Sequence, residues 1–226
     1  MAQMDSSPAT VADRVIPADL ASDLFATACS ILSIPRISTD ALVVFPGLVG
    51  EYWRVWDAII HWEVGREARH FLIAGEYPHT DYREKDLIGL EIENLKKPPF
   101  RLKRTKGVHI QPFAENTKVQ AEWACELLAR LGALSVILFA SPFHLVRCYL
   151  TLLKVWQERN LEPIIIVPSP TIVSPGTIIP EMAADSWALF PGEVWRINDY
   201  QEKGWIASLR ELKDYLEWLY EKIGAD

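Results

Sequence analysis

Short apolar runs alternate with helix-forming stretches along most of this chain, and that alternation restricts its fold more than any other feature. Strands that alternate with helices form right-handed βαβ units, whose sheet is mostly parallel and covered by helices on both faces. The sequence therefore predicts an α/β protein, a three-layer Rossmann-like sandwich with a mostly parallel sheet. The expected strands are 41–45, 71–74, 108–110, 134–140 and 163–167, and the expected helices are 18–32, 55–66, 84–95, 117–131, 144–159, 189–203 and 207–223.

The chain is long enough for one sizeable core but short for two separate domains. It has 226 residues, of which 50% are hydrophobic, and a single domain of this size buries most of the apolar surface of its unfolded chain. We expect an N-terminal polar tail and helix over residues 1–38 and a single α/β domain over 39–226. The proline-rich segment 169–180 is expected to be an extended loop.

Charge, cysteine content and hydropathy argue against several classes of function. A net charge of −7 disfavours a nucleic-acid partner, and the one basic stretch, 96–106, is interrupted by proline and is typical of a solvated loop. No apolar run reaches the roughly 18 residues of a membrane helix. The three cysteines lack metal-ligand spacing and fit a reducing compartment. We therefore expect a cytoplasmic protein with no membrane partner and no metal site.

A helix is expected directly after the apolar run 134–140, and its first turns carry a histidine and an arginine. Ser141 is a favourable N-cap, and Pro142 fits the first helical position, where its missing N–H costs nothing. His144 and Arg147 are three residues apart and share one face of the helix near its positive end. This arrangement predicts an anion-binding site.

Two earlier strand-to-helix junctions carry further candidates. Gly47 follows the first strand and precedes Arg54, but there is no GxGxxG pattern, so dinucleotide binding of the NAD type is disfavoured. Gly75 and Glu76 follow the second strand, where a glycine permits close approach of a ligand and a carboxylate contacts hydroxyl groups. A plain connecting turn at the first junction and a solvated loop at the second remain alternative interpretations.

The third junction precedes the expected helix 117–131 and reads Glu115, Asn116, Thr117. Asn116 is a favourable N-cap, and capping alone would explain its presence. Glu115 is less easily explained by structure, because a carboxylate at the edge of the sheet serves either as a general base or as a ligand for ribose-type hydroxyls.

These junctions are expected to converge, because ligands of such sheets bind at the carboxyl ends of the strands, where the strand order reverses. We expect Arg54 and Arg147 to bind an anionic group, His144 to act as a catalytic acid or base, Glu115 to act as a second base, and Asn116 to position the ligand. The ligand-binding set is completed by Gly47, Gly75, Glu76, Thr117 and Ser141. The expected ligand is a negatively charged, hydroxyl-bearing small molecule such as a nucleotide or a sugar phosphate.

The chain resembles the YdcF-like family, which includes the SanA and ElyC types. The resemblance rests on Glu115-Asn116-Thr117 and on Ser141 with His144 and Arg147, and it extends over roughly residues 40–167. Family members have consecutive glycines where this chain has Phe45-Pro46-Gly47, and the acidic residue that members carry after the second strand corresponds best to Glu84. The resemblance implies a Rossmann-like fold and, from some members, S-adenosylmethionine as a cofactor, but no agreed reaction.

Three hypotheses of function follow. The first is a cytoplasmic Rossmann-like enzyme that acts on a nucleotide-like or phosphorylated small molecule at the carboxyl edge of the sheet. The second is a regulatory module that binds S-adenosylmethionine or a nucleotide without turnover. The third is a subunit of a complex that assembles through some of the nine tryptophans, which otherwise serve the core or a ligand pocket.

Overall fold

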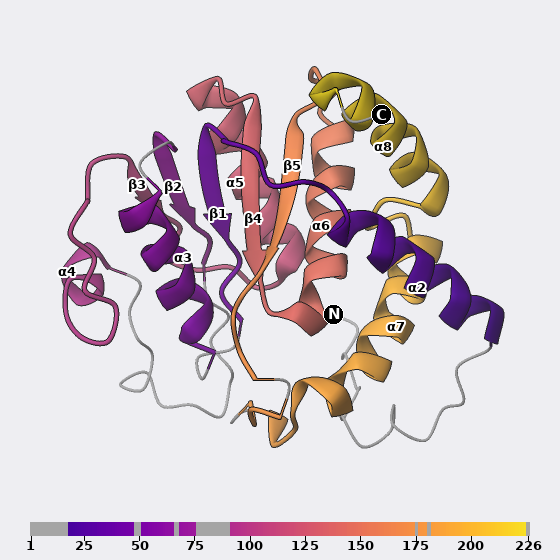
Figure 1. The fold of residues 1–226 in the computed structure, drawn as a ribbon, viewed down its shortest axis with the longest axis horizontal. Coiled ribbons are helices and arrows are strands. Elements are labelled where there is room, and N and C mark those ends of the chain that lie inside the picture. The colour runs from indigo at the N-terminus through magenta and orange to yellow at the C-terminus, as the bar shows by residue number, and fades with distance from the viewer. Residues whose placement is uncertain are drawn as a thin grey trace.

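The fold is built on a five-stranded sheet in which every pair of neighbouring strands is parallel (Figure 1). The computed structural model describes residues 18–47, 51–65, 68–75, 91–174, 176–179 and 182–224. The strand order is β3-β2-β1-β4-β5. The bounds are β1 (Ala41–Val44), β2 (His70–Ile73), β3 (Val108–Ile110), β4 (Ser135–Ala140) and β5 (Ile165–Pro170).

Helices cover both faces of this sheet, so the predicted three-layer Rossmann-like α/β fold is confirmed. Figure 1 shows α3 on the near side of β1 and β2, with α5 and α6 on the far side. The two faces carry separate hydrophobic cores, one containing Trp62 of α3 and the other Tyr149 of α6. The helices are α2 (Ala18–Leu32), α3 (Trp53–Val64), α4 (Ile92–Leu95), α5 (Thr117–Leu131), α6 (Pro142–Gln157), α7 (Ser186–Glu202) and α8 (Leu209–Ile223).

Local signals set the bounds of α5, which match the prediction. The helix starts at Thr117 because the side chain of Asn116 accepts hydrogen bonds from the backbone N–H groups of Lys118 and Val119, at 2.9 and 3.1 Å. It stops at Gly132, which adopts the left-handed conformation with φ of 64°. The predicted capping role of Asn116 is therefore confirmed.

Helix α2 and strand β3 also match their predicted bounds, whereas most other elements differ from theirs by one to three residues. Strand β5 continues to Pro170 instead of stopping at Val167, because it stays in register with β4 along its whole length. Prolines are tolerated there because β5 lies at the edge of the sheet. Of the helix expected over 84–95, the structure describes only α4, and residues 76–90, which include Glu76 and Glu84, lie outside the described part of the chain.

The connectivity places a crevice at one edge of the sheet. From β1 the chain moves outward through β2 to β3, and it then returns to the other side of β1 to form β4 and β5. The strand order therefore reverses between β1 and β4, where α3 and α6 leave toward opposite faces of the sheet. Parallel sheets bind ligands at such a switch point. None of the helices in the described part of the chain is both long and apolar enough to cross a membrane.

Candidate functional site

A cavity of about 690 Å³ lies at this switch point. It is bounded by the carboxyl end of β1, by the N-terminal turns of α5 and α6, and by α7. Of the predicted site residues, Gly47, Arg54, Glu115, Asn116, Thr117, His144 and Arg147 line it. Ser141 and Gly75 do not line the cavity, but they accept hydrogen bonds from the lining residues Arg54 and Gln120, respectively. Glu76 lies outside the described part of the chain.

Arg54 is buried and links several residues that line or border the cavity. Its guanidinium forms an ion pair with Glu51, at 2.6 Å to Oε1 and 2.7 Å to Oε2. It also donates to Oγ of Ser141 at 2.7 Å, to the carbonyl of Phe45 at 3.3 Å and to Nδ1 of His144 at 2.9 Å. These contacts use all five of its N–H groups, and the side chain is only 1% exposed. The anion-binding role expected of Arg54 therefore finds no donor here, and the residue acts by positioning its neighbours.

Ser141 is part of the same cluster. Its hydroxyl donates to Oε1 of Glu51 at 2.8 Å and accepts from Nε of Arg54, and the residue is fully buried. The structure confirms Ser141 as the N-cap residue by position, but its side chain makes no capping hydrogen bond. Instead, the Ser141 side chain links the junction between β4 and α6 to Arg54 of α3. Ser141 does not line the cavity.

The two predicted glycines are required by close packing of the chain. A Cβ at Gly47 would overlap Oε2 of Glu51 and come within 2.8 Å of Cζ of Arg54, so the ion pair lies directly against this backbone. A Cβ at Gly75 would overlap the backbone of Phe113. Gly75 also accepts a hydrogen bond at its carbonyl oxygen from the Gln120 side chain, at 2.7 Å. Packing therefore accounts for both glycines without a ligand.

The contact with Arg54 fixes the proton of His144. A guanidinium only donates hydrogen bonds, so Nδ1 of His144, 2.9 Å from Arg54, must be the acceptor. The ring proton is then on Nε2, which lies 3.3 Å from Oγ1 of Thr117. Burial, followed by the positive charges of Arg147, Arg54 and Arg196, holds the pKa of His144 well below its usual value. The imidazole is therefore neutral and donates toward the cavity.

Thr117 continues this series of hydrogen bonds to the cavity. Its hydroxyl oxygen accepts from Nη1 of Arg147 at 3.0 Å and from Nε2 of His144. A threonine hydroxyl has two acceptor positions and one donor proton, so with both positions occupied the O–H is left to donate. The chain of contacts from Arg54 through His144 to Thr117 thus directs a hydrogen-bond donor at the cavity.

Arg147 faces the cavity and is paired with Glu193 of α7. Nε of Arg147 lies 2.6 Å from Oε2 of Glu193 and Nη2 lies 3.2 Å from Oε1, and Arg196 adds a contact of 2.9 Å. Burial alone would raise the pKa of Glu193, but the charges and hydrogen bonds of Arg147 and Arg196 outweigh it and lower the pKa. Two arginines share one carboxylate, so this corner of the cavity carries an excess positive charge.

Glu51, Glu193 and Arg196 line the cavity but were not predicted from the sequence. Glu193 pairs with Arg147 of another helix, 46 residues away, which a search over short spacings does not detect, and the pairing of Glu51 with Arg54 three residues later was not recognised. One signal was available, because Glu193, Arg196 and Tyr200 recur at helical spacing and so share a face of α7. That face forms a wall of the cavity.

The remainder of the lining is largely apolar and aromatic, which makes the cavity amphipathic. Besides the polar groups around Arg147, the lining includes the aliphatic side chains of Ile179, Met182, Leu189 and Ile206 and the rings of Phe143, Tyr200 and Trp205. Glu115 and Lys118 are exposed at the mouth. In the described part of the chain, no group of three or more His, Cys, Asp or Glu side chains is arranged to hold a metal ion.

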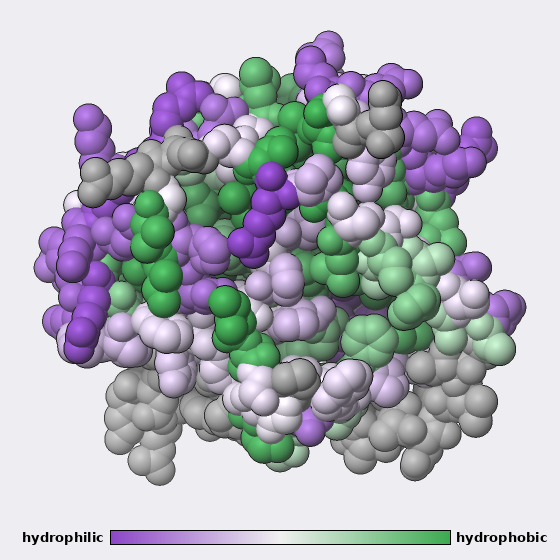
Figure 2. Space-filling model, in the orientation of Figure 1, coloured by the Kyte–Doolittle hydropathy of each residue, from purple (hydrophilic) through white to green (hydrophobic). Residues whose placement is uncertain are grey.

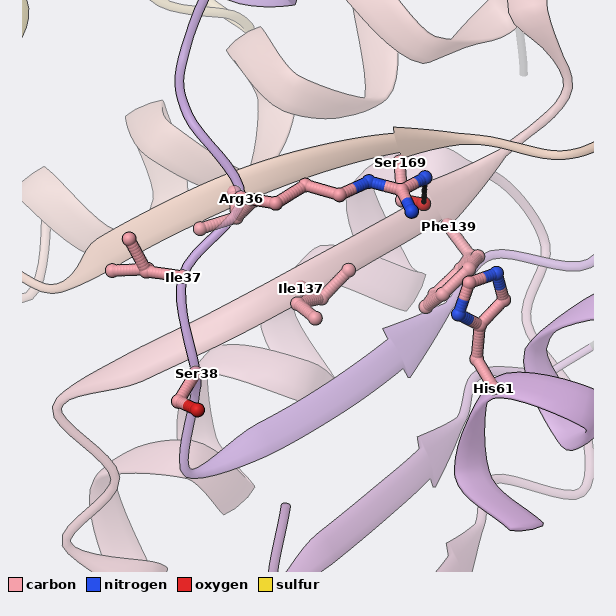
Figure 3. A pocket seen from close by; sticks show the side chains of 8 residues that line it. Arg36, Ile37, Ser38, His61, Ile137, Phe139 and Ser169 are labelled. Atoms are coloured by element: carbon pink, nitrogen blue, oxygen red, sulfur yellow. Dashed lines mark hydrogen bonds between the residues drawn. The ribbon is translucent and has the colours of Figure 1, made fainter. Parts of the chain in front are cut away.

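A second, smaller cavity of about 310 Å³ lies on the near face of the sheet, away from the predicted residues. Figure 3 shows its floor, formed by Ile137 and Phe139 of β4, and the side chain of Arg36, which extends across it to Oγ of Ser169 at 3.4 Å. His61 of α3 closes one side. On this face of the molecule, hydrophilic side chains gather over α4 and α8, with apolar ones between them (Figure 2). The larger cavity has the richer set of buried charges.

The fold and the larger cavity define a Rossmann-like α/β protein with a cavity at its switch point. No family model matches the sequence, and no curated protein is similar enough to count as a relative. The resemblance to the YdcF-like family therefore stays a prediction.

Proposed function

We propose that this protein is an enzyme that binds a nucleotide-like or phosphorylated small molecule at the carboxyl edge of its sheet. The observation that carries the proposal is the convergence of hydrogen-bond donors on one corner of the cavity. The Thr117 hydroxyl is left as a donor by its two accepted bonds, and Arg147 and Arg196 contribute guanidinium groups that share the single carboxylate of Glu193. A corner with directed donors and excess positive charge suits a phosphate or carboxylate group.

The N-terminus of α6 supports the same placement of the anion. His144 is in the first turn of this helix, and Arg147 follows one turn later. The positive end of the helix dipole favours negative charge at this point. The hydroxyl-bearing part of the ligand would then extend toward Glu115 at the mouth.

In this proposal His144 is a neutral donor that orients Thr117, and it is not the acid or base expected from the sequence. Its Nδ1 faces a guanidinium and its Nε2 already carries the proton, so neither nitrogen is free to take one. Within the described lining, Glu51 and Glu193 are buried in ion pairs, whereas Glu115 is exposed. Glu115 is therefore the lining carboxylate best placed to act as a general base.

The alternative is a regulatory module that binds S-adenosylmethionine or a nucleotide without turnover. The fixed protonation of His144 favours it, because a cavity built from oriented donors binds an anion without requiring proton transfer. Consumption of the ligand separates the two. An enzyme depletes it over hours, and Glu115→Gln slows that depletion, whereas a binding module returns it unchanged.

Thr117→Val tests the proposed anion site, because valine keeps the shape of threonine and removes only the hydroxyl. We expect nucleotides and sugar phosphates to raise the melting temperature of the wild type, since a ligand at 100 times its Kd adds about 2.7 kcal/mol of stability. In Thr117→Val the lost hydrogen bond to a charged group weakens binding by about 10- to 100-fold.

Thr105→Val is the matched control, since Thr105 lies in the loop before β3 and does not line the cavity. Its ligand affinity is expected to equal that of the wild type. Equal affinity of Thr117→Val and wild type would overturn the placement of the anion, and absence of any bound anion in the wild type would overturn the proposed function.

A further inference from the structure

We infer that the ligand carries a planar aromatic base, and that Trp205 determines specificity by stacking on it. This inference rests on the proposed function and narrows its ligand from phosphorylated small molecules in general to nucleotides. The observations that carry it are the position of Trp205 at the cavity, the contacts of its ring and its exposure.

The end of α7 presents Trp205 to the cavity. Gly204 adopts a left-handed conformation with φ of 68°, which turns the chain back just after the helix. The backbone N–H of Trp205 then donates to the carbonyl of Tyr200 at 2.9 Å. This turn holds the tryptophan against the last turns of α7, and both it and Tyr200 line the cavity.

The Trp205 ring has two neighbours in the protein and is still partly exposed. The ammonium group of Lys203 lies over it, 4.9 Å from the ring centroid, and the Tyr200 ring contacts it at 5.3 Å with an angle of 54° between the planes. The side chain nevertheless stays 44% exposed. Protein contacts thus orient the indole, while a large part of Trp205 at the cavity is left uncovered and available to a ligand.

The size and lining of the cavity favour a base over a bare sugar. A volume of about 690 Å³ exceeds what a phosphate at Arg147 would fill, and the lining also includes Tyr200, Trp205 and Ile206. A sugar phosphate has only hydroxyl groups to place there, whose desolvation against apolar walls is unfavourable. A purine or pyrimidine ring presents a flat apolar face, and base–aromatic stacking is favourable for any base.

The test compares one pair of ligands on two proteins by isothermal titration calorimetry. Adenosine 5′-monophosphate and ribose 5-phosphate share the anionic group and the ribose, and they differ in the base. We expect the wild type to bind the nucleotide about 5- to 150-fold more tightly, the range that corresponds to stacking of one base. In Trp205→Ala most of that preference disappears, while the affinity for ribose 5-phosphate stays within about twofold.

Trp187→Ala is the matched control, because Trp187 is also on α7 but is 72% exposed and does not line the cavity. It should keep the full preference for the nucleotide. If Trp205→Ala does not fold, Trp205→Leu replaces it, since leucine keeps apolar cover but has no ring to stack, and it too should lose the preference.

Each other outcome has a definite meaning. Equal affinity of the two ligands for the wild type overturns this inference and leaves the proposed function standing. A preference that survives in both Trp205 variants overturns the role of Trp205. If neither ligand binds the wild type, the proposed function fails, and the inference fails with it.

Discussion

Arg54 shows how much of the candidate site depends on single residues whose hydrogen-bond donors are all used within the protein. Its guanidinium joins the end of β1, α3 and the start of α6, and through Nδ1 of His144 it decides which ring nitrogen carries the proton. Replacing such a residue changes the direction of hydrogen bonds as well as their number. The functional group at the cavity, the Thr117 hydroxyl, is oriented two contacts away from it.

At the same scale, Gly47→Ala is expected to destabilise the protein by about 1–3 kcal/mol, the usual cost of overpacking a filled site. The added methyl group would overlap the Glu51 carboxylate, which is fixed by its ion pair with Arg54 and cannot move aside. Urea denaturation measures the loss. Gly176→Ala is the control, because a Cβ there meets nothing within 4 Å. Equal stability of both variants would show that the Glu51–Arg54 ion pair can move away from the added methyl group at little cost in free energy.

At the scale of elements, α5, α6 and α7 contribute different parts of the site. The first turns of α5 and α6 supply Thr117 and His144, and α7 supplies the counter-charge Glu193 and the ring of Tyr200. Each start or end that was predicted well has a local cause, such as Asn116 at the start of α5. The end of β5 was predicted badly, because its length is set by pairing with β4 and not by its own sequence.

Asn116→Ala tests whether capping accounts for Asn116. We expect a loss of about 1 kcal/mol in the free energy of unfolding, because two backbone N–H groups at the start of α5 lose their acceptor. Ligand affinity should stay within about twofold, since the loss of a cap acts on the stability of the helix. Ser208→Ala removes the corresponding cap of α8, away from the cavity. A fall in affinity for Asn116→Ala alone would assign Asn116 to ligand binding.

For the molecule as a whole, the partly buried His109 and the buried His144 make stability depend on pH. Burial lowers the pKa of His109, as does the positive charge of His70 beside it, and His144 is shifted further in the same direction. In the unfolded chain both have an ordinary pKa near 6.5. The folded protein therefore binds fewer protons than the unfolded chain below that pH, and its stability is lost as the pH falls.

We expect the free energy of unfolding to fall between pH 7 and pH 5 with a slope of up to about 1.4 kcal/mol per pH unit for each histidine. Urea denaturation at several pH values gives the slope. The window avoids Glu193 and Asp40, whose pKa values are lowered from ordinary carboxyl values and whose contributions are lost only at lower pH. In His109→Gln the slope should decrease, and a flat profile for the wild type would contradict both assignments.

The fold class, the exact bounds of α2, α5 and β3, and the approximate bounds of most other elements could be predicted from the sequence, because apolar periodicity and capping residues act over a few neighbouring positions. The sequence also identified seven residues that line the cavity, since strand ends in a parallel sheet meet at one edge. Their contacts and their protonation depend on the tertiary structure. Ion pairs such as Arg147–Glu193 join positions 46 residues apart, and proton placement on His144 depends on a guanidinium that another helix brings to within 2.9 Å.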